Sequence, residues 1–175
     1  MKADFTAAPL KPANGQSWAF VVLPHAVSEK LARRGRITVI AAINGYSFEV
    51  MLEPDGKKSH WLQISKEQLE LSGAAIGTDV QFEIVAVNEE PEPQVPADFA
   101  TALHGSSDAY DTWQATTTIA RLDWIHWITS AKQQKTRTKR INDACNMLAS
   151  GKKRVCCFDS SGFYSKAFSA PQAAD

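Results

Sequence analysis

Five cations lie within the nine-residue segment KQQKTRTKR and give this chain its clearest candidate for chemistry. They are Lys132, Lys135, Arg137, Lys139 and Arg140. Clustered Lys and Arg side chains bind phosphates and carboxylates, and two arginines three residues apart on a helix are spaced to clamp one such anion. The segment therefore indicates an anion- or partner-binding site at these five residues. It is a cluster of charge and not a set of catalytic residues.

Arg137 is set apart by its position on the predicted helix. Ile141, Ala144 and Leu148 form an apolar stripe along that helix, and Arg137 falls on the same side one turn earlier. An unpaired charge facing a core costs several kcal/mol at least. We therefore expect Arg137 to hold a bound anion or to form an ion pair, either with the acidic part of the chain or with Asp123.

The charged residues are separated by sign along the chain, although the formal net charge is zero. From Glu67 to Ala120 there are ten acidic residues and no Lys or Arg, whereas from Arg121 to the end there are ten bases and four acids. The two blocks either pair with each other, within one subunit or across a dimer, or leave the basic block to bind a nucleic acid or another polyanion. The zero net charge and the absence of aromatic residues among the bases argue against nucleic acid.

Two histidines deserve a separate hypothesis. Asp123 and His126, at helical spacing i and i+3, form a minimal general-base pair, but no nucleophile can be assigned to them, so they are weak catalytic candidates. The alternative is a histidine held at the edge of a buried helix. His60 faces the same way as Leu62 on a predicted strand, so we expect a hydrogen-bonded core histidine, with contact to a ligand inside a barrel as the alternative.

The four histidines and three cysteines match no metal-ligand spacing, and no glycine-rich phosphate loop is present. We therefore expect no metal and no cofactor. The cysteine number is odd and Cys156 is adjacent to Cys157, which suits no ordinary disulfide framework. No signal-like segment and no apolar stretch of about 20 residues is visible. These features predict a cytoplasmic protein without membrane insertion.

Short alternating segments predict an α+β protein that begins with a small antiparallel, split β-barrel at residues 17–88. The expected strands are 17–23, 36–43, 46–52, 59–64 and 80–86, with brief helices at 26–34 and 65–72. Asn44-Gly45 between two apolar runs is the strongest local sign of a hairpin with a type I′ turn. Ser65 and Gln68 have the spacing of a capping box.

The remaining segments complete the predicted domain organisation. Residues 1–16, with two prolines and no periodicity, should be a disordered arm. Residues 89–95 form an acidic, proline-punctuated linker to a helical domain at 96–151, and its helices are expected at 97–103, 107–115, 118–131 and along the basic segment. Residues 152–175 form a tail whose last stretch should be disordered.

Two blocks of sequence resemble known families. INGYSFEV, with His60 and the later GTDV, resembles a small N-terminal β-barrel domain of unknown function. VPADFATAL followed by WITSAKQQKTRTKRI resembles the YdeI/OmpD-associated family, also called bacteriocin-protection proteins. In the second block the pairs Ala131-Lys132, Thr136-Arg137 and Arg140-Ile141 fall where the family has AK, TR and RI. This chain departs from the family in having Lys135 where an acidic residue usually precedes the TR pair.

The resemblance implies a fold more than an activity. The barrel is similar to the swapped-hairpin fold of small bacterial transcription factors, which implies nucleic-acid binding and a homodimer as possibilities by analogy. Together with the residues above, it leads us to expect a non-enzymatic binding or stress-protection protein that takes an anionic ligand or a protein partner on its basic helix. The alternatives are a nucleic-acid-binding regulator and a small enzyme that uses Asp123 and His126.

Overall fold

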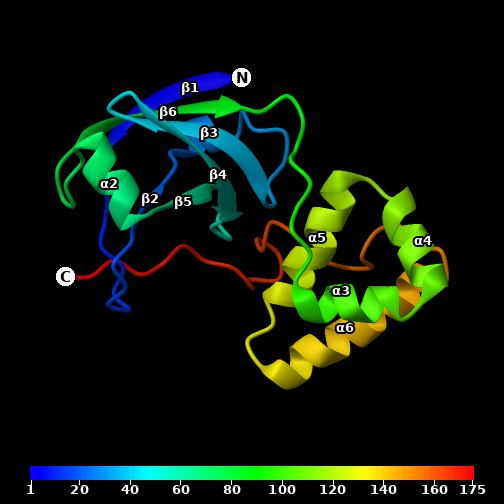
Figure 1. The fold of residues 1–175 in the computed structure, drawn as a ribbon. Coiled ribbons are helices and arrows are strands. Elements are labelled where there is room, and N and C mark those ends of the chain that lie inside the picture. The colour runs from blue at the N-terminus through cyan, green and yellow to red at the C-terminus, as the bar shows by residue number, and fades with distance from the viewer. The chain divides into compact units, whose positions relative to one another are not determined.

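A computed structural model describes residues 1–175. The chain forms two compact units (Figure 1). The first contains Met1–Glu89 together with Ser161–Asp175, and the second contains Glu90–Ser160. The last fifteen residues thus belong to the same unit as the N-terminus.

The first unit is built on one curled antiparallel sheet of six strands, which confirms the predicted α+β class and forms a half-barrel (Figure 1). The strands are β1 (Lys2–Ala7), β2 (Ala19–Val22), β3 (Ile37–Ile43), β4 (Tyr46–Pro54), β5 (His60–Ile64) and β6 (Val80–Ala86). Their order across the sheet is β1-β6-β3-β4-β5-β2, and every neighbouring pair is antiparallel. Alternate residues of these strands, among them Val39, Ala41, Leu62 and Phe82, are fully buried in a common core.

Local turn and cap signals are confirmed in this unit. Asn44 and Gly45 have φ values of 50° and 84°, as a type I′ turn requires, and they join β3 to β4. α2 (Lys66–Ser72) begins with the expected capping box, in which the side chain of Ser65 accepts from the Gln68 amide and the Gln68 side chain accepts from the Ser65 amide. The predicted helix at 26–34 is shorter than expected, because α1 (His25–Ser28) is followed by tighter turns.

The prediction of a disordered arm at residues 1–16 is wrong. β1 pairs along its whole length with β6, from Lys2 opposite Val85 to Ala7 opposite Val80. The ring of Phe5 stacks on Phe82 with centroids 5.0 Å apart. The two prolines come after the strand, so they end it without preventing it. The prediction rested on the average composition of sixteen residues, and it therefore missed the six residues that form an edge strand.

The prediction of disorder at the end of the tail is also wrong. The amide of Ala13 donates to the carbonyl of Gln172 at 2.8 Å, and the amide of Ala174 donates to the carbonyl of Lys11 at 2.8 Å. Figure 1 shows this C-terminal segment beside the loop that follows β1. Backbone hydrogen bonds hold this segment in place. Such bonds do not depend on a pattern of side chains, so the sequence gives no sign of them.

The second unit consists of four helices. They are α3 (Ala97–His104), α4 (Ser107–Ala115), α5 (Thr118–Thr129) and α6 (Gln134–Ala149). α5 is the buried helix that its sequence predicts, with Leu122, Trp124 and Ile128 essentially inaccessible to solvent. Thr117 caps α5 by accepting a hydrogen bond from the Ala120 amide at 3.1 Å. The core of the unit forms where α5 meets the apolar stripes of the other helices.

Candidate functional site

The lysines of the basic segment lie exposed near the start of α6. We call Lys135 and Lys139 of α6, together with Lys132 just before its N-cap, the lysine face of α6. The N-cap residue of α6, Gln133, makes no side-chain cap hydrogen bond, and the first turn contains no acidic residue. Within the face, Nζ of Lys139 donates to a carboxylate oxygen of Asp143, one turn later, at 2.7 Å. The N-terminal end of α6 is therefore positively charged by both its side chains and its backbone.

Arg137 forms a two-bond ion pair with Asp98 of α3. Its Nε donates to Oδ2 at 2.7 Å and its Nη2 donates to Oδ1 at 3.0 Å. This hydrogen-bonded guanidinium lowers the pKa of the Asp98 carboxyl, and Asp98 in turn raises the pKa of Arg137. Since Asp98 belongs to the acidic block, the pair is one of the arrangements that the sequence led us to expect for Arg137.

Arg140 is held by the end of α5 instead. Its Nη1 donates to the carbonyl of Trp127 at 2.6 Å and to Oγ of Ser130 at 3.3 Å. Its guanidinium also lies over the Trp127 ring, 5.5 Å from the centroid. Arg137 and Arg140 thus contact different groups in this structure, and a single anion clamped by both stays a prediction.

The weak catalytic candidates Asp123 and His126 lie in different surroundings. Asp123 lines a hollow of about 190 Å³ that includes Arg154 and Phe158 but not His126. His126 is 2% exposed, and its ring meets that of Phe158 edge to face at 5.2 Å. Burial of His126 in an aromatic contact agrees with the alternative of a histidine packed at a helix edge.

His60 is buried in the sheet unit, and both of its ring nitrogens have hydrogen-bond partners. Nδ1 lies 2.5 Å from Oγ of Ser28, and Nε2 lies 2.9 Å from the carbonyl oxygen of Gly35. The carbonyl can only accept, so Nε2 carries the proton and Nδ1 accepts from the serine. Burial is the main cause that lowers the pKa of His60. The geometry is that of a hydrogen-bonded core histidine.

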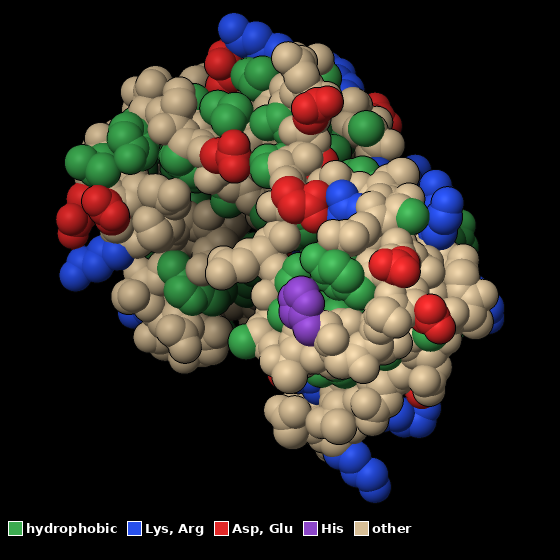
Figure 2. Space-filling view, turned by 45° about the vertical axis from the view of Figure 1, so that its right-hand side comes forward, with side chains coloured by type: hydrophobic (Ala, Val, Ile, Leu, Met, Phe, Trp, Pro, Cys, Tyr) green, Lys and Arg blue, Asp and Glu red, His purple; other side chains and the backbone are tan.

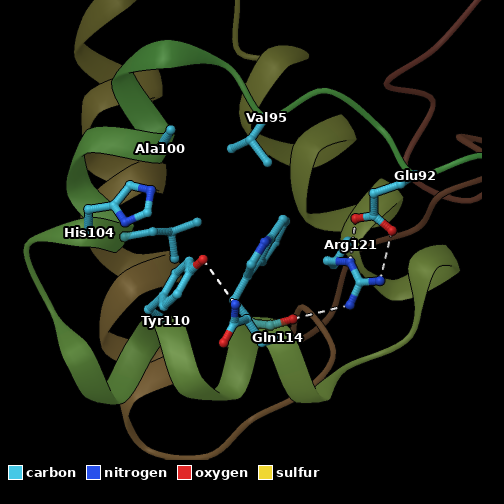
Figure 3. A pocket seen from close by; sticks show the side chains of 9 residues that line it. Glu92, Val95, Ala100, His104, Tyr110, Gln114 and Arg121 are labelled. Carbon is cyan, nitrogen blue, oxygen red and sulfur yellow. Dashed lines mark hydrogen bonds and ion pairs between the residues drawn. The ribbon is translucent and has the colours of Figure 1, made fainter.

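A cavity in the helical unit was not expected from the sequence. Its volume is about 420 Å³, and we call it the Tyr110 cavity (Figure 3). It is lined by Glu92, Val95, Ala100, Leu103, His104, Tyr110, Trp113, Gln114 and Arg121. The residues come from the predicted linker and from α3, α4 and α5, so no single segment of the sequence carries the pattern.

One wall of the Tyr110 cavity is an ion pair between Arg121 and Glu92. Nε of Arg121 donates to Oε1 of Glu92 at 2.6 Å and Nη2 donates to Oε2 at 2.8 Å. The other N–H groups of Arg121 donate to the carbonyls of Trp113 and Thr116 and to Oγ1 of Thr118. The hydrogen bonds from Arg121 lower the pKa of the Glu92 carboxyl. All of these bonds together fix the guanidinium, so this wall is polar yet close to neutral.

The opposite wall is aromatic. The rings of His104 and Tyr110 lie 4.8 Å apart, and Nε2 of Gln114 donates to the Tyr110 hydroxyl oxygen at 2.9 Å. Figure 3 shows these three side chains facing the ion pair across the cavity. In the sequence, Glu92 is the last acidic residue before the helical domain, and Arg121 is the first base after the acidic block. No sequence pattern indicates that these two residues form an ion pair.

On the face shown in Figure 2, acidic and basic side chains are interspersed among uncharged ones and do not form one large field of a single sign. No helix is long and apolar enough to span a membrane.

Two family models match the chain. Residues 5–84 match a domain of unknown function (DUF1905), and residues 92–151 match the family described as bacteriocin-protection, YdeI or OmpD-associated. Residues 92–151, 60 of the 175 residues, are thus similar to the YdeI/OmpD-associated family. The YdeI/OmpD-associated match contains the lysine face, the Asp98–Arg137 pair and the whole Tyr110 cavity. The first match begins inside β1, in the segment predicted to be disordered. No curated protein matches the chain.

Proposed function

We propose that this chain is a non-enzymatic cytoplasmic binding protein that takes an anionic partner on the lysine face of α6. The observation that carries the proposal is the exposure of Lys132, Lys135 and Lys139 at a helix start that no side chain caps. The first backbone N–H groups of a helix bear partial positive charge and favour a bound anion. Three lysines at that end add to the same attraction.

Arg137 and Arg140 support this surface by fixing α6. Arg137 joins α6 to α3 through Asp98, and Arg140 joins it to the end of α5. An anion bound at the Nε–Nη2 edge of Arg137 would have to displace Asp98, which holds that edge with two hydrogen bonds. We therefore assign the contact with the partner to the lysines and the positioning of the helix to the arginines.

The description of the family supplies the proposed setting. It names bacteriocin protection, and we carry over to this chain a role in protection against stress that acts by binding. A homodimer is part of the proposal only by analogy with swapped-hairpin relatives of the barrel.

An NMR titration tests the proposal. The ¹⁵N-labelled protein is titrated with inorganic phosphate, with poly-glutamate and with a short mixed-sequence single-stranded DNA. We expect the amide signals of residues 133–139 to move with at least one of these probes, and to stop moving in K132Q/K135Q/K139Q. The control K11Q/K30Q/K66Q changes three exposed lysines of the sheet unit by the same net charge.

The outcome for each probe separates the candidates. Shifts with DNA and none with poly-glutamate would favour the nucleic-acid-binding regulator. If the shifts of residues 133–139 survive in K132Q/K135Q/K139Q, or are equally reduced in the control, the lysine face is not the binding site and the proposal is wrong.

A second candidate function is the binding of a small planar ligand in the Tyr110 cavity. Its volume of about 420 Å³ is within the usual range of small-molecule sites, about 300–1,000 Å³. Tyr110 and Trp113 offer aromatic surface, and the carboxylate of Glu92 offers hydrogen-bond acceptors at the rim. The combination suits a flat ring with N–H donors on one edge.

Indole and adenine are suitable probes for this cavity. We expect ligand-induced shifts at the amides of α4 that disappear in A100F, because Ala100 points into the cavity (Figure 3) and a benzyl group there would fill it. A149F, which adds the same group at an exposed position of α6, should leave binding unchanged. Equal binding by wild type and A100F would remove this candidate.

A further inference from the structure

Cys156 and Cys157 lie close together on an exposed loop after α6, outside both candidate sites. Both are exposed, and their Sγ atoms are 2.9 Å apart. Side chains of neighbouring residues in extended chain point to opposite faces. Here Cys157 has a φ of 64°, in the left-handed region, and the two thiols lie on the same side of the backbone.

The surroundings of the two sulfurs favour reaction with an oxidant. The hydrogen bond between the two thiols raises the pKa of Cys157. The positive charge of Lys152 opposes this rise. Lys153 and Arg154 add two more cations within three residues, and a basic, exposed environment is typical of reactive cysteines. Cys145, by contrast, is partly buried, and burial raises the pKa of its thiol.

We propose that Cys156 and Cys157 form a two-electron redox site, which a hydroperoxide oxidises to a disulfide between neighbouring residues. The thiol of Cys156 releases its proton and its Sγ attacks the peroxide; the O–O bond breaks, Cys156 becomes a sulfenic acid, and the leaving oxygen takes up the released proton and departs as water or an alcohol. Sγ of Cys157 then loses its proton and attacks Sγ of Cys156, the S–O bond breaks and water leaves. The sulfur pair has lost two electrons and the peroxide has gained them.

The adjacency of the two residues makes this disulfide a reversible one. The sulfurs must approach from 2.9 Å to about 2.05 Å. Consecutive Cα atoms are about 3.8 Å apart, below the roughly 4.4–6.8 Å that unstrained disulfides span. Strained, exposed disulfides are the readily reduced ones. A thiol reductant should therefore restore both cysteines, as a regulatory site requires and a structural bridge does not.

The test treats the full chain with one equivalent of hydrogen peroxide and measures free thiols and intact mass. We expect the three free thiols to fall to one, the monomer mass to decrease by two hydrogen atoms, and dithiothreitol to reverse both changes. C145S should lose the same two hydrogens. C156S and C157S should lose none, and dimedone should trap a sulfenic acid in C157S.

Other outcomes would overturn the proposal. They are oxidation that adds only oxygen to the wild-type chain, thiol loss only through disulfide-linked dimers, and peptide mapping that joins Cys145 to either neighbour. Because both cysteines are exposed, the serine variants are expected to fold, and far-ultraviolet circular dichroism checks that they do.

Discussion

At the scale of residues, the arginines and the lysines of the helical unit have different roles. Arg121 and Arg137 each bind a carboxylate with two hydrogen bonds, and Arg140 donates to the carbonyl of Trp127 in the last turn of α5. The planar guanidinium suits such fixed, two-bond contacts, whereas the flexible ammonium of lysine remains hydrated. The arginines therefore fasten the linker and the helices, and the exposed Lys132 and Lys135 remain available to a partner, whereas Lys139 pairs with Asp143.

The Asp98–Arg137 pair should couple α3 to α6 measurably. In a double-mutant cycle with D98A and R137A we expect a coupling free energy of about 0.5–1 kcal/mol, because solvent screens a partly exposed pair. The pKa of Asp98 is lowered in the folded chain, so this stability is present above the ordinary carboxyl range and is lost as the pH falls through the lowered pKa. Urea unfolding of the four proteins of the cycle gives the coupling free energy at pH 7 and at pH 3. A coupling free energy of zero at pH 7 would show that the pair does not contribute to the stability of the fold.

His60 should make the sheet unit sensitive to mild acid. Its pKa is lowered on folding, so the unfolded chain binds the proton more tightly. The stability that neutral His60 contributes is therefore complete above about pH 6.5 and decreases as the pH falls from there towards the lowered pKa. We expect H60Q to be less stable at pH 7 by about 1–3 kcal/mol, with a flatter dependence between pH 7 and pH 5.

The exposed His25 provides the control for this prediction. H25Q removes an exposed imidazole beside Glu29 and leaves His60 with both of its partners, so the acid sensitivity that His60 causes should persist in this variant. If H60Q and wild type lose stability in parallel between pH 7 and pH 5, the acid sensitivity has another source.

At the scale of elements, what could be predicted depended on whether the signal is local. The Asn44-Gly45 hairpin and the Ser65 cap of α2 were readable because turn and cap geometry involve only a few consecutive residues. β1 and the C-terminal segment were missed because their order comes from hydrogen bonds to strands and loops far away in sequence. The residues of α5 are apolar almost all round the helix, and this was enough to predict its burial.

The packing of the C-terminal segment against the turn after β4 should depend on Gly56. Its φ is 75°, and a Cβ at this position would overlap the carbonyl oxygen of Phe168. Gly45 has a similar φ of 84° with open space around it, so G45A introduces backbone strain alone. We expect G56A to cost at least about 1 kcal/mol more than G45A, and to let trypsin cut at the exposed Lys166. Equal stability and equal cleavage of the two variants would contradict this account of the segment.

At the scale of the whole chain, part of the separation of charge by sign is resolved inside the helical unit. Glu92 and Asp98 of the acidic block pair with Arg121 and Arg137 of the basic block. Pairing between the blocks was one of the two alternatives that the sequence left open, because their signs are complementary. It could not predict which residues pair or that the Tyr110 cavity forms, since both depend on how the linker and four helices pack.

Salt dependence is the property of the whole protein that tests the central claim most directly. The dissociation constant for a mixed-sequence single-stranded DNA and for poly-glutamate is measured between 50 and 200 mM salt, for wild type and for K132Q/K135Q/K139Q. We expect the wild type to bind at least one of the two probes, with the logarithm of the dissociation constant rising linearly as log salt rises, and the variant to show a shallower slope and weaker binding. A wild type that binds neither at 50 mM salt, or a variant whose slope and affinity match those of the wild type, would contradict an anionic partner on the lysine face of α6.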